Sequence, residues 1–370
     1  MYKVFIFSSV HRYDDTRILY KQAKSLSKNY KVELHAPSPF KEKKINNVKV
    51  VGLPQWKNIN DRSKIRKIIW KRIKDSNADI FHFHDPELLW IGIKIKLFIR
   101  KPVIYDIHED HSKAILSKVW IPKFFRLPVS YIFSLIELFF GRIINNLIYT
   151  TTIIGEKFGN VNKIGIYNYP FKNNIKNNKS VKNLEEIIYV GGITKIRGFV
   201  EIIDSLNILK KRGVKFNFKI IGPIQHKDFK DQINDLILKY DLKENIEFLG
   251  LLPYNEIFRH IESAIVGLLC YLPEPNHLVT FPNKIFEYIS VGTAVIASDF
   301  PLYRHIIKDT NSGILVNPSN SKDIAEKILY SLNNPKKMIE YGENGKKNIL
   351  NRYNWEMEEI KLIKYYEGLL

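Results

Sequence analysis

The chain has 370 residues, of which 45% are hydrophobic and 13% aromatic, a composition that excludes a disordered protein and suits two globular domains. Its single cysteine, Cys270, excludes a disulfide within the chain and suits a reducing compartment. The net charge of +20 is unevenly distributed: residues 1–180 contain 33 Lys and Arg against 14 Asp and Glu, whereas residues 181–370 contain 25 against 24. The basic first half indicates an anionic partner. Three kinds are compatible with this charge: an anionic membrane face, a phosphorylated acceptor and nucleic acid.

Short β-rich runs alternate with helical stretches, a pattern that predicts parallel sheets with crossover helices. The first ten residues, "MYKVFIFSSV", alternate like a strand and have too short an apolar run for a signal peptide. In the first half we expect strands at 3–7, 31–36, 48–53, 79–84, 102–108 and 146–152. We expect helices there at 16–28, 62–75, 87–98 and 128–145.

A polar segment rich in Asn and Lys, without periodicity, predicts a linker at 168–184 between a domain at 1–167 and a second at 185–352. A final helix is expected at 353–370. Strands of the second half are expected at 186–192, 216–222, 245–250, 264–270, 293–299 and 313–318. The simplest architecture is α/β, with two doubly wound, Rossmann-like domains facing each other across a cleft. Loops at the carboxyl ends of the strands, where such sheets bind ligands, would form that cleft.

Two glycines mark a candidate phosphate site. The sequence has neither a Walker motif nor the G-x-G-x-x-G fingerprint, but "YVGGITKIRGF" places Gly191 and Gly192 directly after a strand, and a helix is expected to start near Arg197. Glycines let a ligand approach the backbone, a helix start offers free N–H groups, and an arginine can bind phosphate. The alternative interpretation is a plain tight turn.

A second segment, "FPNKIFEYISVGTAVIASDFP", predicts a helix that begins at Pro282, ends at Gly292 and carries Lys284 and Glu287 on one face. A cation at the start of a helix is unfavourable unless an anion is bound there. A carboxylate one turn further suits a vicinal diol such as that of ribose. The alternative is a surface ion pair. Together the two segments predict a nucleotide diphosphate site, with Arg197 and Lys284 on the phosphates and Glu287 on the ribose.

The first half offers candidates for an acceptor site. In "VIYDIHEDH", His108 follows a buried strand at the end that faces a cleft, with Glu109 beside it. The loop "SSVHRYDDTRI" contains His11, Asp15 and Arg17. Asp15 is also suited to cap the next helix, and a structural hydrogen bond is the alternative role of His108.

Two further histidines, His82 and His84, alternate along one strand and therefore share a face. That spacing is compatible with a metal site, but packing at the strand end is the preferred interpretation. No Cys and His cluster resembles a zinc site. We therefore expect no metal.

The segment "PNKIFEYISVGTAVIASDFP" resembles the donor-binding signature of the retaining GT-B glycosyltransferases of family 4. Further matches are "YVGGITKIRGF", "ADIFHFHDPELLW", "PVIYDIHED" and the closing "YNWEMEEIKLIKYYEGLL", so the resemblance covers essentially the whole chain. It implies two Rossmann-like domains of the GT-B fold, of which the second binds a sugar nucleotide and the first the acceptor. It also implies that the final helix, from Trp355 onward, crosses back to the first domain.

The resemblance assigns roles to individual residues. Glu287 matches the second glutamate of the E-x7-E motif of the family, which binds ribose, whereas Val279 stands in place of the first glutamate. Contact with the donor sugar is then expected from backbone groups or from neighbours such as Glu274 or Asn276. His108 matches the family histidine that lies near the reacting sugar.

A second departure concerns the phosphate loop. Gly192 stands where many relatives have an arginine, paired with the lysine that Arg197 matches. Diphosphate binding is then expected to depend on Arg197, Lys284 and backbone amides.

The function that the resemblance implies is the metal-independent, retaining transfer of a hexose or N-acetylhexosamine from a nucleotide-diphosphate sugar, a UDP-sugar being favoured. It implies front-face attack, in which the departing diphosphate takes the proton of the acceptor hydroxyl, and no cofactor. Two alternatives are a sugar-nucleotide epimerase on the same fold and a non-catalytic protein that binds a polyanion or nucleic acid. The position of Arg197, Lys284 and Glu287 in the neutral half argues against nucleic acid. The oligomeric state stays open.

Cations and aromatic residues alternate in "KVWIPKFFR", as is typical of a membrane interface. They are Lys118, Trp120, Lys123, Phe124, Phe125 and Arg126. The longest apolar run, 127–140, has 14 residues and contains Glu137, so we expect no membrane span. We expect a cytoplasmic protein, peripheral at the inner face of the cell membrane, that meets a glycan or polyprenyl-diphosphate-linked acceptor in bacterial surface polysaccharide synthesis.

Overall fold

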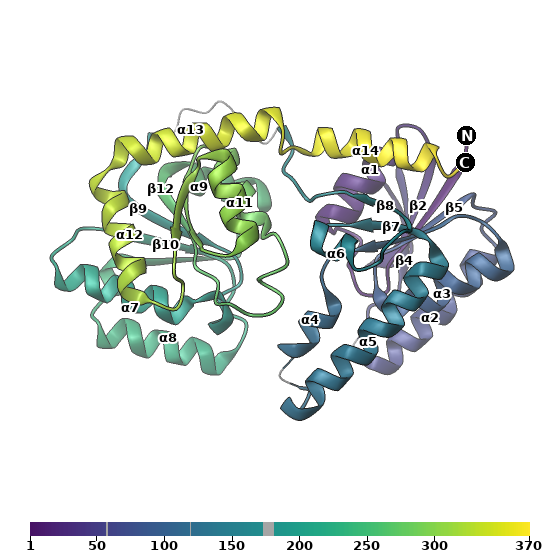
Figure 1. Ribbon diagram of the computed structural model, residues 1–370, viewed down its shortest axis with the longest axis horizontal. Coiled ribbons are helices and arrows are strands. Elements are labelled where there is room, and N and C mark those ends of the chain that lie inside the picture. The colour runs from purple at the N-terminus through teal and green to yellow at the C-terminus, as the bar shows by residue number, and fades with distance from the viewer. Residues whose placement is uncertain (57, 119, 173–180) are drawn as a thin grey trace. The chain divides into compact units, whose positions relative to one another are not determined.

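The computed structural model describes residues 1–56, 58–118, 120–172 and 181–370 and divides the chain into two compact units. We call them the N-terminal unit, Met1–Asn168 with Trp355–Leu370, and the C-terminal unit, Tyr169–Asn354. Each unit is built on its own largely parallel sheet, with helices packed against it (Figure 1). The predicted α/β class with two Rossmann-like domains is therefore confirmed, and the cleft between them stays a prediction.

The sheet of the N-terminal unit has eight strands among the described residues, in the order β3-β4-β2-β1-β5-β6-β7-β8, with β3 antiparallel to β4. They are β1 (Lys3–Phe7), β2 (Lys31–Pro37), β3 (Glu42–Ile45), β4 (Val48–Leu53), β5 (Ile80–Phe83), β6 (Val103–Ile107), β7 (Asn146–Tyr149) and β8 (Asn162–Gly165). The six predicted strands are present. The sequence does not predict the edge strands β3 and β8, because "EKKI" and "NKIG" are short and polar.

Helices of several kinds connect these strands. They are η1 (Thr16–Ala23), α1 (Lys24–Leu26), α2 (Ile59–Lys74), η2 (Pro86–Leu88), α3 (Leu89–Lys94), η3 (Ile95–Ile99), α4 (His111–Leu116), α5 (Lys123–Ile144), α6 (Thr152–Glu156) and α14 (Trp355–Glu367). The helix expected at 16–28 is a π-helix, η1, followed by the short α1. The final helix, α14, packs on this unit: the Trp355 indole donates to Ser25 Oγ over 3.0 Å, and the Tyr167 amide donates to Glu358 over 2.9 Å.

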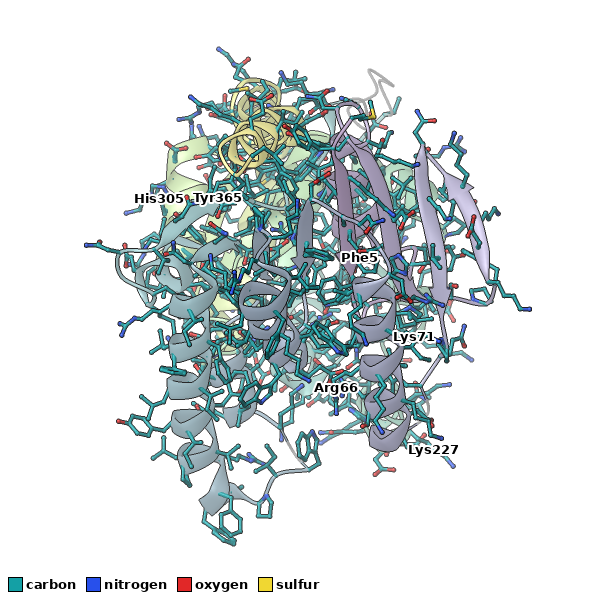
Figure 2. All side chains as sticks on the ribbon, turned by 90° about the vertical axis from the view of Figure 1, so that its right-hand side faces the viewer. Phe5, Arg66, Lys71, Lys227, His305 and Tyr365 are labelled. Atoms are coloured by element: carbon teal, nitrogen blue, oxygen red, sulfur yellow. The ribbon has the colours of Figure 1, made fainter. Side chains whose placement is uncertain are left out.

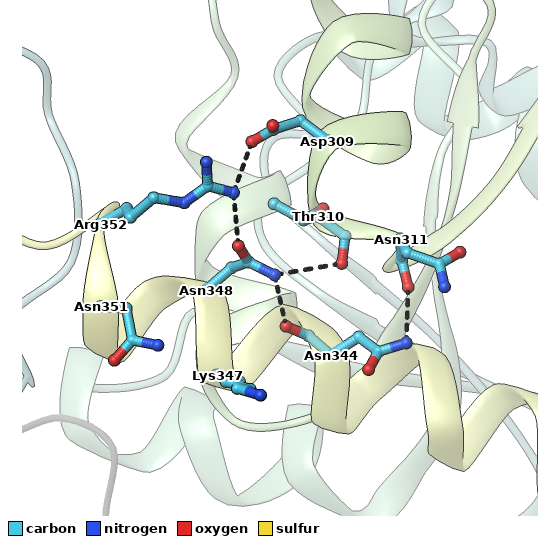
Figure 3. A pocket seen from close by; sticks show the side chains of 8 residues that line it. All are labelled: Asp309, Thr310, Asn311, Asn344, Lys347, Asn348, Asn351 and Arg352. Atoms are coloured by element: carbon cyan, nitrogen blue, oxygen red, sulfur yellow. Dashed lines mark hydrogen bonds and ion pairs between the residues drawn. The ribbon is translucent and has the colours of Figure 1, made fainter.

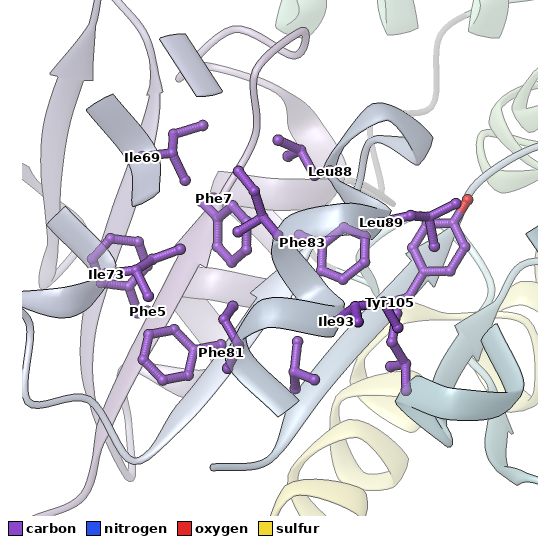
Figure 4. Close-up of a cluster of buried hydrophobic side chains, with 14 of the residues drawn as sticks. Phe5, Phe7, Ile69, Ile73, Phe81, Phe83, Leu88, Leu89, Ile93 and Tyr105 are labelled. Carbon is purple, nitrogen blue, oxygen red and sulfur yellow. The ribbon is translucent and has the colours of Figure 1, made fainter. Parts of the chain in front are cut away.

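One face of this sheet forms an aromatic core. Strand alternation places Phe5, Phe81, Phe83 and Tyr105 on the same face, where they pack with α2. Figure 4 shows these rings together with Ile69 and Ile73 of α2. The outer side of α2 carries exposed cations such as Lys71, whereas Phe5 lies within the sheet (Figure 2).

The opposite face of the same strands is polar at its carboxyl end. His82 and Asp106 alternate with the aromatic residues, so they point away from that core. β5 pairs with β6 in parallel, with Phe83 opposite Tyr105. His84, the residue that follows β5, lies beside Asp106, with its Nδ1 3.3 Å from Asp106 Oδ2.

The sheet of the C-terminal unit has the order β11-β10-β9-β12-β13-β14 in the described part, all parallel. Its strands are β9 (Asn183–Val190), β10 (Asn217–Ile221), β11 (Ile246–Gly250), β12 (Ala264–Leu269), β13 (Ala294–Ser298) and β14 (Gly313–Val316). Its helices are η5 (Lys195–Arg197), α7 (Phe199–Lys211), α8 (Lys227–Lys239), η6 (Lys243–Asn245), α9 (Tyr254–Ser263), α10 (Asn283–Ser290), α11 (Pro301–Thr310), α12 (Ser321–Asn333) and α13 (Pro335–Asn351). The strand order reverses between β9 and β12, and open α/β sheets bind ligands outside the carboxyl ends of such strands.

Within the described residues, α5 is the one helix that is long and apolar enough, by length and composition, to cross a membrane. It has 22 residues, and its most apolar window has a mean hydropathy of 1.6 and is 22% buried. The helix begins earlier than predicted, at Lys123 after Pro122, and continues through Pro128. It is therefore longer than the apolar run that the sequence shows.

Candidate functional site

The loop after β9 brings three predicted donor-binding residues together: Gly191, Gly192 and Arg197. The Arg197 Nη1 donates to the carbonyl oxygen of Gly192 over 2.9 Å. Gly191 has a φ of +144°, a conformation that other residues rarely adopt, and an added Cβ would lie 3.1 Å from the same guanidinium nitrogen. The glycine pair therefore lets the guanidinium lie directly against the backbone.

A third glycine, Gly198, joins this loop to α7. Its φ is +70°, and a Cβ on it would lie 1.9 Å from the carbonyl oxygen of Cys270, the residue that follows β12. The start of α7 can pack against the end of β12 only because this Cβ is missing. The predicted helix start near Arg197 is confirmed, with the single turn of η5 before α7.

Lys284 and Glu287 share one face of α10, as predicted, and they form the ion pair that the sequence analysis gave as the alternative interpretation. Lys284 Nζ lies 2.5 Å from Glu287 Oε2, and the two side chains are 23% and 10% exposed. The next residue, Tyr288, fixes the helix: its hydroxyl accepts from the Val190 amide over 2.9 Å and donates to the Leu268 carbonyl over 3.3 Å. Since Val190 ends β9 and Leu268 lies in β12, the pair is held at the point where the strand order reverses.

Tyr271, two residues after β12, connects the two segments. Burial raises the pKa of its hydroxyl, the positive charge of Arg197 lowers it and the negative charge of Glu287 raises it. The Arg197 guanidinium lies 5.4 Å from the centre of the Tyr271 ring. Both charged groups therefore lie near one buried hydroxyl. The sequence analysis missed Tyr271, although its position directly after a strand at the reversal point was an available signal.

The segment before α10 bears on the donor sugar. Val279, which replaces the first glutamate of the motif, is buried, with 5% of its surface exposed. Asn276 Oδ1 is buried and has no hydrogen-bond partner in the described part of the chain. The backbone carbonyl of Asn276 accepts from Thr280 Oγ1 over 2.8 Å, which fixes this turn. Asn276 thus has a side-chain acceptor that no described group uses, in the segment between β12 and α10.

In the N-terminal unit, a buried carboxylate lies at the end of β6. Asp106 is fully buried and accepts from Arg17 Nε over 3.1 Å, from Arg17 Nη2 over 2.9 Å and from Gln22 over 2.6 Å. Arg17 also donates to the Ile166 carbonyl over 2.9 Å. Arg17 is only 5% exposed, so its predicted exposure to an acceptor is corrected: the guanidinium holds Asp106 in place instead. Asp15 caps η1 by accepting from the amide of Arg17 over 2.9 Å.

The predicted catalytic residue, His108, lies against this carboxylate. His108 Nε2 is 3.3 Å from Asp106 Oδ2 and 2.9 Å from His84 Nδ1. His84 Nδ1 is also 3.3 Å from the same carboxylate oxygen. His82 continues the network to α14, because its Nδ1 lies 2.6 Å from the Tyr366 hydroxyl. The His108 side chain keeps 14% of its surface exposed, whereas His84 and Asp106 are fully buried.

Burial and neighbouring charges give the carboxylate and the imidazoles of this network different protonation states. Burial alone raises the pKa of Asp106, but the charges of Arg17 and His108 lower it well below its usual value of 3.8. Burial lowers the pKa of His84 well below 6.5, and it also lowers the pKa of His82. The network therefore contains an ionised carboxylate and two neutral imidazoles behind His108.

Three residues of this network also have the ligand types of a metal site. His82, His84 and Asp106 offer nitrogen and oxygen atoms within 4.8 Å of one another. Both Asp106 oxygens already accept hydrogen bonds from Arg17, however, and a guanidinium repels a cation at this distance. The arrangement suits a hydrogen-bond network better than a metal centre.

The loop after β1 carries the remaining acceptor candidates. His11 Nδ1 lies 3.3 Å from Asp15 Oδ2, and the His11 ring lies 5.2 Å from that of His108. Burial lowers the pKa of His11, but the hydrogen bond to Asp15 and the charges of Asp85, Asp15 and Glu109 outweigh it and leave the pKa raised. His11, Asp15 and His108 are therefore grouped, with the exposed Glu109 near enough for its charge to act on His11.

Asp85 holds that loop in place. Its Oδ2 accepts from the Ser9 amide over 2.6 Å, from Ser8 Oγ over 2.8 Å and from the Val10 amide over 3.2 Å. This carboxylate of "HFHDPELL" is thus a structural support, in agreement with the packing interpretation of that segment.

A shallow pocket of about 340 Å³ lies elsewhere in the C-terminal unit, between α11 and α13 (Figure 3). It is lined by Asp309, Thr310, Asn311, Asn344, Lys347, Asn348, Asn351 and Arg352. Asn348 donates to the Thr310 carbonyl over 3.3 Å, and Asn344 donates to the Asn311 carbonyl over 3.4 Å. These contacts join the two helices, and none of the lining residues is a predicted site residue.

Comparison with known proteins places the chain in a family. The family model described as Glycosyl transferases group 1 matches residues 170–348, which include every predicted donor-binding residue. The amylovoran biosynthesis glycosyltransferase AmsK of Erwinia amylovora is 28% identical over 171 residues, 46% of this chain and 41% of that protein. The capsular polysaccharide biosynthesis glycosyltransferase CapM of Staphylococcus aureus is 25% identical over 224 residues, 59% of this chain and 56% of that protein. The chain thus spans about half the length of these two relatives.

Two further similarities extend over the whole chain. An α-1,4-N-acetyl-D-galactosaminyltransferase of Campylobacter jejuni, named for acting on GalNAc-alpha-(1->4)-GalNAc-alpha-(1->3)-diNAcBac-PP-undecaprenol, is 23% identical over 370 residues, 97% of this chain and 94% of that protein. The crystal structure of HepE from Anabaena in complex with UDP-glucose has a TM-score of 0.76 and 15% identity, and the match covers 100% of both chains. The family match therefore assigns residues 170–348 to the group 1 glycosyl transferases, and the similarity over the full length shows that the chain has the GT-B fold.

Proposed function

We propose that this protein is a retaining glycosyltransferase that transfers a hexose or N-acetylhexosamine from a UDP-sugar to a lipid-linked glycan. The observation that carries the proposal is the convergence of Arg197 and the Lys284–Glu287 pair around Tyr271, at the reversal point of the C-terminal sheet. The relative from Campylobacter jejuni, named for an undecaprenol-linked acceptor, and the UDP-glucose complex of HepE support this choice of substrates.

On the donor side, the ligand replaces contacts that the protein now makes with itself. The diphosphate takes Lys284, and the ribose diol donates to Glu287, so the ion pair between them opens. A guanidinium has five N–H donors and an ammonium three, which leaves Arg197 and Lys284 with donors for phosphate oxygens. Asn276 Oδ1 accepts from a hydroxyl of the donor sugar, in place of the missing glutamate.

The reaction then needs positioning and charge stabilisation more than a protein nucleophile. Arg197 and Lys284 stabilise the negative charge that develops on the leaving diphosphate. His108, fixed by Asp106 and His84, orients the reacting sugar or the acceptor hydroxyl. The acceptor proton passes to the departing phosphate oxygen.

The location follows from the acceptor. A lipid-linked glycan is held at a membrane, so we place the enzyme in the cytoplasm at the inner face of the cell membrane. The charge of residues 1–180, which contain 33 Lys and Arg against 14 Asp and Glu, supports this location, because anionic lipid headgroups attract a basic domain.

The donor is tested by binding first. UDP-, GDP- and ADP-sugars are added singly to the full chain, and the melting temperature is recorded, since a ligand that binds only the folded state raises it. A UDP-sugar is expected to raise the melting temperature and to release UDP when a polyprenyl-diphosphate-linked glycan is added. If no nucleotide sugar raises the melting temperature or is consumed with any glycan acceptor, the proposal is wrong.

The role of His108 is tested by His108→Ala. Turnover is expected to fall by about 100-fold, the loss that misplacing a reacting group can cause, while the affinity for the nucleotide stays close to that of the wild type. Steady-state kinetics and UDP titration separate the two quantities. An unchanged rate returns His108 to a structural role.

A further inference from the structure

Helix α5 exposes a continuous apolar face. Phe124 is 73% exposed, Leu127 70% and Phe139 62%. The exposed apolar residues of this helix are Phe124, Phe125, Leu127, Val129, Tyr131, Ile132, Leu135, Ile136 and Phe139. Their spacing places them on one side of the helix. An apolar surface of this extent on a water-facing helix marks a binding site for a partner or a membrane.

The other side of α5 is fixed to the protein. Glu137 is 1% exposed, and its carboxylate accepts from the hydroxyl of Tyr105 on β6 over 2.8 Å. Ser130 Oγ donates to the Ser112 carbonyl over 2.6 Å. Gly141 lies against Phe158, where an added Cβ would be 2.5 Å from the ring. The helix also packs along α3, as Figure 1 shows.

This attachment decides between two roles in a membrane. The length of α5, 22 residues at 1.5 Å each, or about 33 Å, would reach across a bilayer. A spanning helix, however, would carry Glu137, Tyr105 and the strands against which α5 packs, β6 and β7, into hydrocarbon. A helix with one buried side and one apolar exposed side instead lies parallel to the surface, with the apolar side between the lipid headgroups.

Cations stand at both ends of the apolar face. Lys118 and Lys123 are exposed before it, and Arg142 is exposed after it. Trp120, 77% exposed, extends the face at its amino end with a residue that is typical of interfaces. From Phe124 to Phe139 the charged residues are Glu137, which is buried, and Arg126, whose Nε donates to the Ile121 carbonyl over 2.8 Å.

We propose that the exposed face of α5 is a docking surface for an anionic lipid bilayer, on which the helix lies flat. The charge distribution selects the bilayer over a second protein: an apolar centre between cations matches acyl chains below anionic headgroups. The biological purpose rests on the proposed function, since docking brings the N-terminal unit to a lipid-linked acceptor. The docking itself is measured without any sugar.

Cosedimentation with vesicles tests the surface. The full chain is mixed with vesicles of phosphatidylglycerol and phosphatidylethanolamine, or of phosphatidylcholine alone. Binding is expected with the anionic vesicles and is expected to weaken as salt is added. Leu127→Ser and Phe139→Ser each remove a large apolar group from the lipid without opening the core, and each is expected to weaken binding about tenfold.

The cations and a control residue are tested in the same way. Lys123→Gln and Arg142→Gln are each expected to weaken binding to anionic vesicles about fivefold. Leu238→Ser is the matched control, because Leu238 is 68% exposed on α8 of the C-terminal unit, close to the 70% of Leu127. It is expected to bind like the wild type.

Three results would overturn the proposal. They are a wild-type chain that does not sediment with anionic vesicles, a Leu127→Ser/Phe139→Ser variant that binds as well as the wild type, and a wild-type dimer in analytical ultracentrifugation without lipid that this variant converts to monomer. The last result would assign the face to a second copy of the chain. Failure of the proposed function is distinguishable, because the melting-temperature screen with UDP-sugars contains no membrane and does not depend on this helix.

Discussion

Near the carboxyl end of β6 both members of a charged pair are buried, whereas on α10 the glutamate of the pair is buried and the lysine stays partly exposed. Asp106 is fully buried and Arg17 is 5% exposed, and they share two hydrogen bonds. Lys284 and Glu287 share one contact of 2.5 Å, with 23% and 10% of their side chains exposed. Both pairs join a cation to a carboxylate, yet their surroundings give them different tasks.

The difference is one of desolvation. A buried charge needs a full set of partners. Removing one member of a buried pair leaves the other charge buried and unpaired, which destabilises the fold. A pair that water still reaches contributes about 0–1 kcal/mol and can be exchanged for a ligand. We therefore expect the Arg17–Asp106 pair to stabilise the fold and the Lys284–Glu287 pair to bind the nucleotide sugar.

The largest effect is expected at the C-terminal pair. Lys284→Ala or Glu287→Ala should abolish turnover, because the diphosphate or the ribose loses its partner, while the free energy of unfolding changes less than for a fully buried pair, since water still reaches Lys284. UDP release measures the first quantity and urea denaturation the second.

The control is a pair of the same spacing that lies outside the site. Lys337 and Glu340 on α13 are 2.7 Å apart and 38% and 52% exposed, so Lys337→Ala should alter neither quantity. Wild-type turnover in either the Lys284 or the Glu287 variant would remove these residues from the donor site.

At the N-terminal pair, Arg17 and Asp106, the main effect of a substitution is expected on stability, not on turnover. Asp106→Asn keeps the shape of the side chain but leaves the Arg17 guanidinium buried without its counter-charge. The free energy of unfolding should therefore fall by about 3–5 kcal/mol. Asp79→Asn is the control, since Asp79, which bonds Lys101 over 3.3 Å, keeps 30% of its side chain exposed and an asparagine there can still accept from the Lys3 amide. Urea denaturation measures both variants. A loss no larger for Asp106→Asn than for Asp79→Asn would show that burial does not distinguish the two pairs.

The sequence was informative wherever partners are close along the chain. The shared face of Lys284 and Glu287 was predicted because residues three apart lie on one side of a helix, and the structure places the two side chains in contact there. The predicted strands follow apolar runs, which are long enough to recognise. The strand β3, Glu42–Ile45, escaped prediction because an exposed antiparallel edge carries no apolar signal.

Contacts between distant segments could not be predicted. Arg17 and Asp106 are 89 residues apart, and His82 and Tyr366 are 284 apart. Before the strand register is known, Arg17 is equally compatible with an exposed loop, which is why it was assigned to the acceptor. The first residues of α5, before Pro128, were missed for another reason: a proline within an apolar run suggests a helix boundary, although the observed helix continues through it.

Glu137 is a buried carboxyl that, unlike Asp106, has no cation paired with it among the described residues. Burial raises the pKa of Glu137 to about 7, from 4.5, although its hydrogen bond from Tyr105 opposes this. Because the folded state then holds the proton more tightly than the unfolded state, stability should fall as the pH rises from about 4.5 to 7 and level off above it. The difference corresponds to about 3 kcal/mol.

Glu137→Gln tests this pH dependence. The amide cannot ionise but can still accept from Tyr105, so the variant should be more stable than the wild type at pH 8 and lose that part of the pH slope. Urea denaturation from pH 4.5 to 8 compares the two proteins. The two stability curves running parallel over this range would show that Glu137 does not titrate as its burial requires.

The smallest effect is expected where α14 meets the histidine network. Tyr366→Phe keeps the ring but removes the hydroxyl that lies 2.6 Å from His82 Nδ1, so stability should fall by about 1 kcal/mol, the typical contribution of one hydrogen bond. Tyr330→Phe is the control, because Tyr330 is 44% exposed on α12, and it should leave stability unchanged. The two variants are compared by urea denaturation, and ¹⁵N shifts of the imidazoles report whether the protonated nitrogen of His82 changes. If Tyr366→Phe alters neither stability nor those shifts, the network ends at His82, and α14 supports it by packing alone.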